Sequence, residues 1–116
     1  MESLREVVLR FASLVEQKEN MKRLTKGWEP FIQLDCTDSD QRYTLAIRNC
    51  GLEKLYDGLE NHSHLITIRG ATGILSEVFD GRMSPAQAII DGKMEVYGED
   101  KDLIKLDAIT LILWDA

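Results

Sequence analysis

Residues 81–98 read GRMSPAQAIIDGKMEVYG, and this stretch predicts a helix, a helix stop and a strand within eighteen residues. Ser84 and Gln87 form the capping-box pattern, in which a side chain at the helix start accepts a backbone hydrogen bond three residues on. Pro85 stands at the first helical position, where its missing N–H costs nothing. The stretch therefore predicts a short helix over residues 84–91.

The second half of the same stretch predicts how that helix ends. Gly92 stands where a helix end favours a residue in the left-handed conformation. Met94 and Val96 then alternate with polar neighbours, as the residues of a half-buried strand do. We therefore expect a strand over residues 93–97, closed by Gly98.

Written as a pattern, this stretch is Gly-Arg-Met-x-Pro-x-x-Ala-x-x-x-Gly-Lys-Met-x-Val-x-Gly, followed by an Asp and an apolar segment. It resembles the lipid-binding domain family of sterol carrier protein type two. Weaker agreement extends to residues 64–68, similar to the family's preceding strand, and to residues 26–28, a Lys-Gly-Trp before the first strand. The resemblance implies an α+β fold: a single five-stranded, mostly antiparallel sheet with helices packed on one face, enclosing an apolar cavity for sterols, fatty acids or acyl chains.

Length and composition are those of one globular domain, which we expect to span residues 1–116. Hydrophobic residues make up 44% of the chain and charged residues 29%, without a low-complexity run. Twenty acidic residues against fourteen basic residues give a net charge of −6. That charge opposes binding to nucleic acids and to anionic bilayers.

Membrane insertion and a disulfide framework are both disfavoured. No apolar run approaches the roughly 20 residues that span a bilayer, and residues 113–116 lack a Ser-Lys-Leu address. We expect a cytoplasmic protein without stable membrane insertion. Cys36 and Cys50 are too few for a disulfide scaffold, so we expect reduced thiols.

Periodicity predicts the other elements. Apolar residues at helical spacing predict a first helix through Leu4, Val7, Val8, Phe11, Leu14 and Val15. A shorter helix follows, for which we expect Asn20 as the cap and Gly27 as the end. A period of two predicts strands at residues 31–36, 43–48, 52–57 and 64–68, the third at a sheet edge.

Three further helices are expected in the second half of the chain, at residues 71–80, 84–91 and 101–113. We expect Asp100 to cap the last of them, with Glu99 and Asp102 also stabilising its N-terminal dipole. The β-branched end of this segment also fits a strand, and the resemblance favours a helix at its start.

No catalytic constellation is evident. His62 and His64 lack further metal ligands nearby, and Ser76 lies in a predicted helix without an activating elbow. Residues 70–73, Gly-Ala-Thr-Gly, follow a strand and open a helix, but their spacing matches no phosphate-binding loop, so a flexible helix start explains them better. We expect no enzyme activity, no metal and no cofactor.

An apolar surplus on the predicted helices remains to be explained. If they enclose the cavity that the resemblance implies, its lining is Leu75, Phe79, Ile89, Ile90, Leu103, Leu106 and Ile109. On the alternative interpretation the same residues simply fill a core. Arg69, Arg82 and Lys93 could pair with an anionic headgroup, or could be solvated surface charges.

The leading hypothesis is non-catalytic binding or transfer of fatty acids, acyl esters or sterol-like lipids. The alternative is an interaction or dimerisation module with the same fold that does not use its cavity. Similar domains occur appended to larger enzymes, including alkylsulfatase-like hydrolases, and a homodimer or a partner enzyme would then contact the apolar tail that ends in Trp114. A hydrolase acting on lipid esters is a third, weaker hypothesis.

Overall fold

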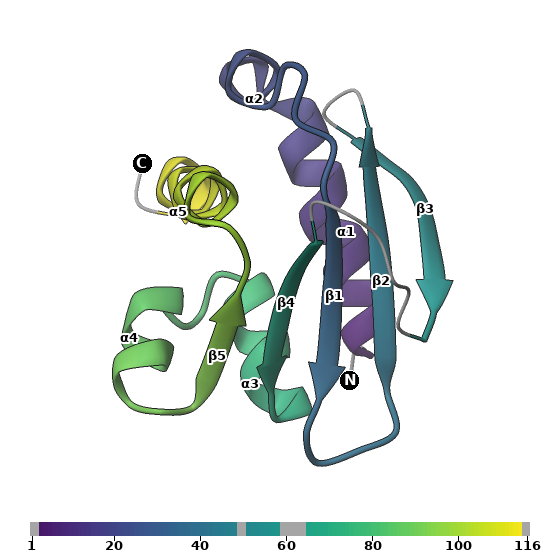
Figure 1. The fold of residues 1–116 in the computed structure, drawn as a ribbon, viewed down its shortest axis with the longest axis vertical. Coiled ribbons are helices and arrows are strands. Elements are labelled where there is room, and N and C mark those ends of the chain that lie inside the picture. Colours follow the sequence, from purple (N-terminus) through teal and green to yellow (C-terminus); the bar gives the residue numbers. More distant parts are fainter. Residues whose placement is uncertain (1–2, 49–50, 59–64, 115–116) are drawn as a thin grey trace.

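The computed structural model of this chain describes residues 3–48, 51–58 and 65–114. One sheet has the strand order β3-β2-β1-β4-β5, and helices cover it (Figure 1). The strands are β1 Phe31–Cys36, β2 Arg42–Arg48, β3 Gly51–Asp57, β4 Leu65–Gly70 and β5 Met94–Tyr97. The helices are α1 Leu4–Gln17, α2 Glu19–Leu24, α3 Thr72–Phe79, α4 Pro85–Ile90 and α5 Asp100–Trp114.

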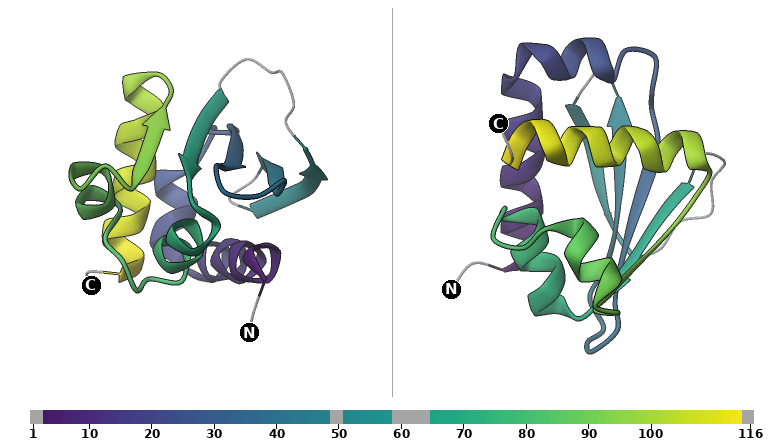
Figure 2. Two further views of the ribbon diagram at one scale, coloured as in Figure 1. Left: turned by 90° about the horizontal axis from the view of Figure 1, so that it is seen from below. Right: turned by 90° about the vertical axis from the view of Figure 1, so that its left-hand side faces the viewer.

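The sheet is mixed, with one parallel pair. β1 runs parallel to β4 at its centre, and the pairs β1–β2, β2–β3 and β4–β5 are antiparallel. The expected five-stranded, mostly antiparallel α+β fold is confirmed, and the predicted third strand does lie at an edge. Figure 2 shows α1, α3 and α5 on the same side of the curved sheet.

The core lies between these helices and β1, β2 and β4. Ile32 of β1 pairs with Leu45 of β2 and with Ile66 of β4, so their side chains share one face of the sheet. All three are at most 5% exposed. Val8 of α1, fully buried, belongs to the same cluster, so the apolar stripe of the first helix faces the sheet as its spacing predicts.

The helix that precedes the sheet differs from its prediction at the start. α2 begins at Glu19, one residue before the expected cap Asn20, and Lys18 occupies the N-cap position without a side-chain hydrogen bond. The reason is that α1 extends to Gln17, which leaves a single extended residue between the two helices. Gly27 follows α2 with φ +74°, as expected of a residue beyond a helix end.

The stretch that opened the sequence analysis folds as predicted. The Ser84 hydroxyl accepts a hydrogen bond from the Gln87 N–H at 3.4 Å, and Pro85 is the first helical residue of α4. Gly92 adopts φ +73°, which lets the chain turn out of α4 and enter β5. Local chemistry alone therefore sets the order of helix, stop and strand here.

The start of α5 corrects one expectation. Asp100 does not cap the helix but is its first residue. The Glu99 carbonyl accepts hydrogen bonds from the N–H groups of Asp102 and Leu103, at 3.0 and 3.1 Å. Glu99 thus stands one residue ahead of the expected cap.

The start of α3 is held from a distant turn. Asp38, in the β1–β2 turn, accepts hydrogen bonds from the Thr72 N–H and the Thr72 hydroxyl, both at 2.8 Å. Ala71 stands at the N-cap and has no side chain that could do this. The sequence predicts a flexible helix start here, whereas in the structure the Asp38 carboxylate binds the first residue of the helix.

Candidate ligand pocket

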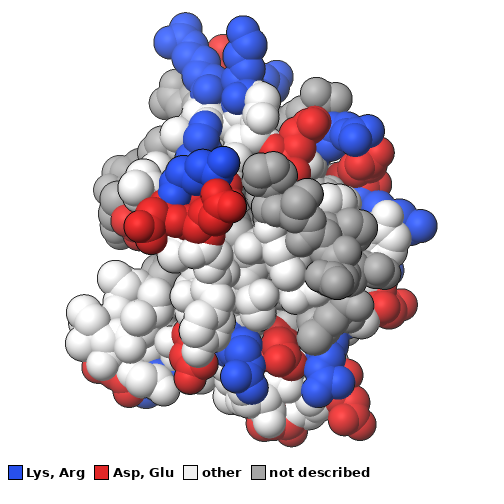
Figure 3. Space-filling model, viewed as in Figure 1, with Lys and Arg blue, Asp and Glu red and all other residues white. Residues whose placement is uncertain are grey.

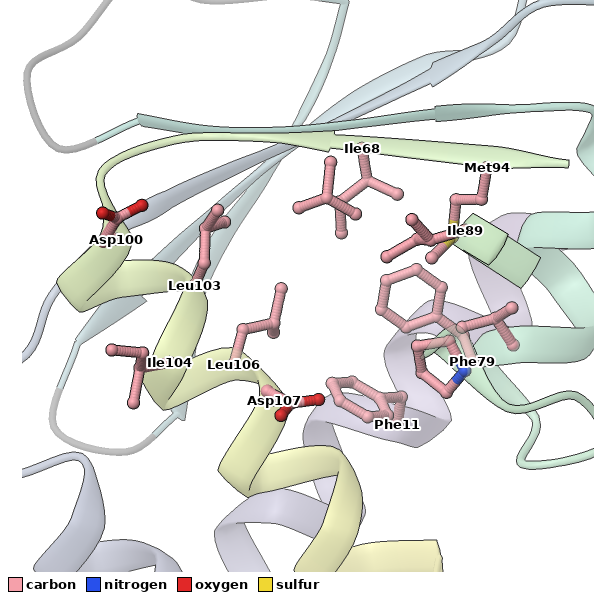
Figure 4. Close-up of a pocket in the computed structure, with 13 residues that line it drawn as sticks. Phe11, Ile68, Phe79, Ile89, Met94, Asp100, Leu103, Ile104, Leu106 and Asp107 are labelled. Carbon is pink, nitrogen blue, oxygen red and sulfur yellow. The ribbon is translucent and has the colours of Figure 1, made fainter. Parts of the chain in front are cut away.

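A cavity of about 470 Å³ lies between α4, α5 and the β4–β5 side of the sheet (Figure 4). Eleven of its thirteen lining residues are apolar and two are acidic. The lining residues are Phe11, Ile68, Val78, Phe79, Pro85, Ile89, Met94, Val96, Asp100, Leu103, Ile104, Leu106 and Asp107.

The floor of the cavity belongs to the sheet. Ile68 of β4 pairs with Val96 of β5, and Met94 lies two residues before Val96 on the same face of β5. Met94 and Ile68 are each 3% exposed, whereas Val96 is half-buried. The period of two in β5 thus supplies an apolar floor from a strand of only four residues.

Two aromatic rings close the inner wall. Phe11 of α1 and Phe79 of α3 meet edge to face, with ring centroids 5.0 Å apart and ring planes at 87°. Both residues are less than 8% exposed, and Val78 beside them is 5% exposed. Aromatic pairs prefer this geometry over a face-to-face stack, so the two rings stabilise each other in this apolar wall.

Two helices form the sides, and their exposed residues mark the opening. Ile89 of α4 is 46% exposed and Ile104 of α5 is 69% exposed, although both line the cavity. Asp100 and Asp107 stand four residues before and three residues after Ile104, on the same face of α5. The cavity therefore reaches the surface between α4 and α5, with two carboxylates on the α5 side.

The charges around this opening are unequal. Figure 3 shows acidic and basic side chains together over α5, whereas the surface over α4 is mostly uncharged. The sequence of α4, PAQAII, contains no charged residue. One side of the opening is thus uncharged, and the other carries charged side chains, of which Asp100 and Asp107 line the cavity.

The structure brings four of the seven predicted lining residues to this cavity: Phe79, Ile89, Leu103 and Leu106. Ile109 lines a smaller pocket of about 40 Å³, which shares Phe11, Phe79 and Leu106 with the larger cavity. Leu75 is fully buried in the core and Ile90 is 77% exposed, and neither lines these two pockets. Ile89 and Ile90 point about 100° apart around α4, and only Ile89 faces this cavity.

Sequence reasoning missed the other lining residues. Phe11 lies on the apolar stripe of α1, but nothing local indicates that this stripe meets a residue sixty-eight positions away. Met94 and Val96 were predicted to be half-buried, which could have placed them in the floor. For Asp100 and Asp107 the available signal is their spacing of seven residues, which places both on the same helix face as Ile104. This spacing alone does not indicate that the face lines a cavity.

The three cations proposed as partners for an anionic headgroup do not line the cavity. Arg69 pairs with Asp35 at 3.2 Å and with Glu95 at 3.9 Å. Arg82 pairs with Asp80 at 2.7 Å, and Lys93 is exposed. The expectation that they face the ligand therefore finds no support in their positions.

Other chemistry finds little support in the part of the chain that the structure describes. Within it, no group of three or more His, Cys, Asp and Glu side chains could hold a metal ion. Ser76 lies inside α3, and Cys36 is a buried free thiol whose pKa is raised, chiefly by its burial. His62, His64 and Cys50 lie outside the described residues. No described helix is long and apolar enough to cross a membrane.

Comparison with known proteins gives a family match. The model of the SCP-2 sterol transfer family matches residues 11–110. This range includes the elements that line the cavity, from Phe11 in α1 to Asp107 in α5. A comparison with curated protein sequences finds no match.

Solved structures share the fold. The "UbiJ-SCP2 Ubiquinone synthesis protein" superposes with a TM-score of 0.70 at 10% identity, covering 97% of this chain and 92% of that one. Palmitated SCP2L2 from Aedes aegypti gives a TM-score of 0.62 at 13% identity, covering 94% and 95%. The inverting sec-alkylsulfatase Pisa1 from Pseudomonas sp. gives 0.62 at 19% identity, covering 76% of this chain but only 14% of the enzyme. This chain thus spans about one seventh of that enzyme's length.

Proposed function

The chain belongs to the SCP-2 sterol transfer family, and from that premise we propose that it binds or transfers hydrophobic ligands in the cavity between α4, α5 and the sheet. Fatty acids, acyl esters and sterol-like lipids are the ligand classes, and the process is binding without catalysis. The observation that carries this proposal is a cavity of about 470 Å³ in which eleven of thirteen lining residues are apolar.

The size and chemistry of the cavity suit such a ligand. Pockets for small molecules typically measure about 300–1,000 Å³ and are lined mainly by apolar side chains. Each CH₂ group removed from water contributes about 0.8 kcal/mol, so an acyl chain of a dozen or so methylenes offsets the cost of immobilising the ligand. Apolar contact discriminates weakly between chains, so broad chain selectivity is expected.

Native mass spectrometry of freshly purified protein, followed by lipid extraction, tests whether a lipid accompanies the chain. A fluorescent lipid that binds the delipidated protein saturably should then be displaced by several unrelated lipids. The absence of saturable binding by every lipid tested would contradict the proposal.

Two adjacent isoleucines provide a matched pair of variants. Ile89→Asp places a charge on the cavity wall and should weaken lipid binding by about tenfold or more, because the ligand would have to desolvate a carboxylate. Ile90→Asp makes the same change on the same helix outside the cavity, at a side chain that is 77% exposed. It should leave lipid affinity unchanged. Equal effects of the two changes would contradict binding in this cavity.

Two observations favour the interaction module as a second function. Ile90 and Tyr97 are 77% and 52% exposed, and the fold match to the alkylsulfatase covers a small part of a larger chain. On this hypothesis a second copy or a partner enzyme would cover these side chains. Sedimentation of the wild type and of Ile90→Asp tests the homodimer, since a dimer through this surface should dissociate in the variant.

A further inference from the structure

The larger cavity and the smaller pocket adjoin each other at one place. Three side chains line both spaces: Phe11 of α1, Phe79 of α3 and Leu106 of α5. The other described residues that line the smaller pocket are absent from the lining of the larger cavity. Phe11, Phe79 and Leu106 therefore form a partition between the two spaces, with a cavity on either side of it.

The smaller pocket has the size and chemistry of an extension of the larger cavity. Its volume of about 40 Å³ exceeds the roughly 10–15 Å³ that one water molecule needs, but it is far below the roughly 300 Å³ of the smallest typical ligand pockets. Its lining is apolar except at Thr25 and Gly51, and the Thr25 hydroxyl already donates a hydrogen bond to the Met21 carbonyl at 2.6 Å. The space beyond the partition thus suits the end of an alkyl chain and not a separate ligand.

A lipid chain that enters from the surface points toward the partition. The opening lies between α4 and α5, and the rings of Phe11 and Phe79 form the wall at the inner end of the cavity. Both rings are packed against each other and less than 8% exposed, whereas Leu106 is half-buried. Figure 4 shows Leu106 pointing from α5 into the cavity. The end of the chain therefore contacts the partition before it can reach the smaller pocket.

We infer that Phe11, Phe79 and Leu106 set the longest alkyl chain that the cavity accepts. The inference rests on the proposed function, because it concerns the chain of a lipid held in the same cavity. Each CH₂ group that the cavity takes out of water strengthens binding by about fourfold. A CH₂ group beyond the partition limit stays at the opening, where it is only partly removed from water and contributes far less.

A series of primary alcohols measures this limit. Alcohols from decanol to eicosanol, each below the concentration at which it aggregates, compete with a fluorescent lipid for the delipidated wild-type protein. The affinity should rise by about fourfold for each added CH₂ group and then stop rising at one chain length. A rise that continues unbroken through the series would overturn the inference, since no wall would then limit the chain.

Two leucines of α5 provide matched variants. Leu106→Ala opens the partition, so the first alcohol beyond the wild-type limit should bind at least about fourfold more tightly than it binds the wild type. Leu103→Ala removes the same atoms from another half-buried residue of α5, which lines the larger cavity and not the smaller pocket. It should leave the limit where the wild type has it. The same limit in both variants would contradict a partition at Leu106.

Filling the smaller pocket from its far side is the reciprocal test. Ala12 of α1 is 7% exposed and lines the smaller pocket but not the larger cavity. Ala12→Leu in the Leu106→Ala background should restore the wild-type limit, because the added side chain occupies the space that Leu106→Ala connects to the cavity. Thermal unfolding of each variant checks that the fold is retained, and Leu106→Val is a smaller truncation for the same comparison if Leu106→Ala does not fold.

The outcomes separate the two proposals. Saturable binding of the alcohols with a limit that neither truncation of Leu106 moves would overturn the chain-length role of the partition and leave lipid binding intact. Failure of the fluorescent lipid and of every alcohol to bind would overturn the proposed function, and the chain-length inference with it.

Discussion

The rings of Phe11 and Phe79 meet edge to face at 5.0 Å and separate two cavities of unequal size. Both rings line the larger cavity of about 470 Å³ and the smaller one of about 40 Å³. The pair joins α1, at the start of the chain, to α3, which follows the sheet's fourth strand. The two side chains that join α1 to α3 therefore also form a wall of the candidate site.

This double role predicts the outcome of Phe79→Ala. Because one side of the ring already faces a cavity, its removal should cost the unliganded protein less than the roughly 3–5 kcal/mol of a fully packed Phe. The change should also connect the two cavities and shift the ligand preference toward bulkier lipids. Thermal unfolding with and without ligand, together with a lipid competition series, measures both effects.

Leu75 is the matched control for that experiment. It lies on the same helix, is fully buried and lines neither cavity. Leu75→Ala should cost the full 2–5 kcal/mol, roughly, and leave ligand selectivity unchanged. A full core penalty for Phe79→Ala, without any change in ligand preference, would mean that the ring belongs to a packed core and not to a ligand site.

Asp38 predicts a pH dependence of stability. The hydrogen bonds from the Thr72 N–H and hydroxyl hold the pKa of the Asp38 carboxyl below its ordinary value. A carboxyl with a lowered pKa in the folded state stabilises the protein above its unfolded pKa, and this contribution is lost as pH falls through the folded pKa. Asp38→Asn should lower the melting temperature at neutral pH. The further fall in melting temperature between neutral and acidic pH should be smaller in this variant than in the wild type.

The comparison for Asp38 is its neighbour in the same turn. Asp40 is exposed, and the Thr72 N–H and hydroxyl donate their hydrogen bonds to Asp38 and not to Asp40. Asp40→Asn should leave both the melting temperature and its pH dependence close to those of the wild type. If the wild type, Asp38→Asn and Asp40→Asn have the same melting temperatures at every pH, the contact of Asp38 with Thr72 contributes nothing to stability.

Elements set by local chemistry could be predicted from the sequence. Ser84, Pro85 and Gly92 each act within a few residues of their own position, so the boundaries of α4 and the entry into β5 could be derived. The hairpin of β1 and β2 followed from a period of two. Patterns of this kind need no knowledge of the tertiary structure.

Contacts between distant segments could not be predicted in this way. The hydrogen bonds from Thr72 to Asp38 and the ring contact of Phe79 with Phe11 join segments that only the completed fold brings together. The orientation of Ile90 depends on how α4 rotates against β5, which two adjacent isoleucines leave open. This is why four of the seven predicted residues line the larger cavity while its floor and acidic edge were missed.

Gly92 and Gly73 predict opposite effects of adding a side chain. A Cβ on Gly92 would meet nothing within 4 Å, so only the backbone conformation at φ +73° opposes it. Gly92→Val should therefore destabilise the protein by at least ~1 kcal/mol through strain. Gly73 also has open space but lies in α3 without a positive φ, so Gly73→Ala should be neutral or stabilising by up to ~1 kcal/mol. Chemical denaturation of both variants measures the difference, and a Gly92→Val protein as stable as the wild type would contradict it.

Trp28 and Asp102 predict a strong energetic coupling between α5 and the segment before β1. The indole Nε1–H donates a hydrogen bond to Asp102 Oδ1 at 2.8 Å, and Asp102 is only 2% exposed. Its Oδ2 is buried and has no hydrogen-bond partner in the described structure, so the indole contact carries much of the compensation for burying this carboxylate. Trp28→Phe should cost about 1–3 kcal/mol beyond the loss of ring volume, because it leaves the second oxygen unpaired as well.

A double-mutant cycle isolates that contribution. Asp102→Leu removes the buried carboxylate while keeping a side chain of similar size, so Trp28→Phe in this background should cost only the loss of ring packing. The difference between the two costs of Trp28→Phe, measured by urea denaturation, should be on the order of 1–3 kcal/mol. If Trp28→Phe lowers the free energy of unfolding equally in both backgrounds, the hydrogen bond between Trp28 and Asp102 does not stabilise the protein, and the indole ring contributes through packing alone.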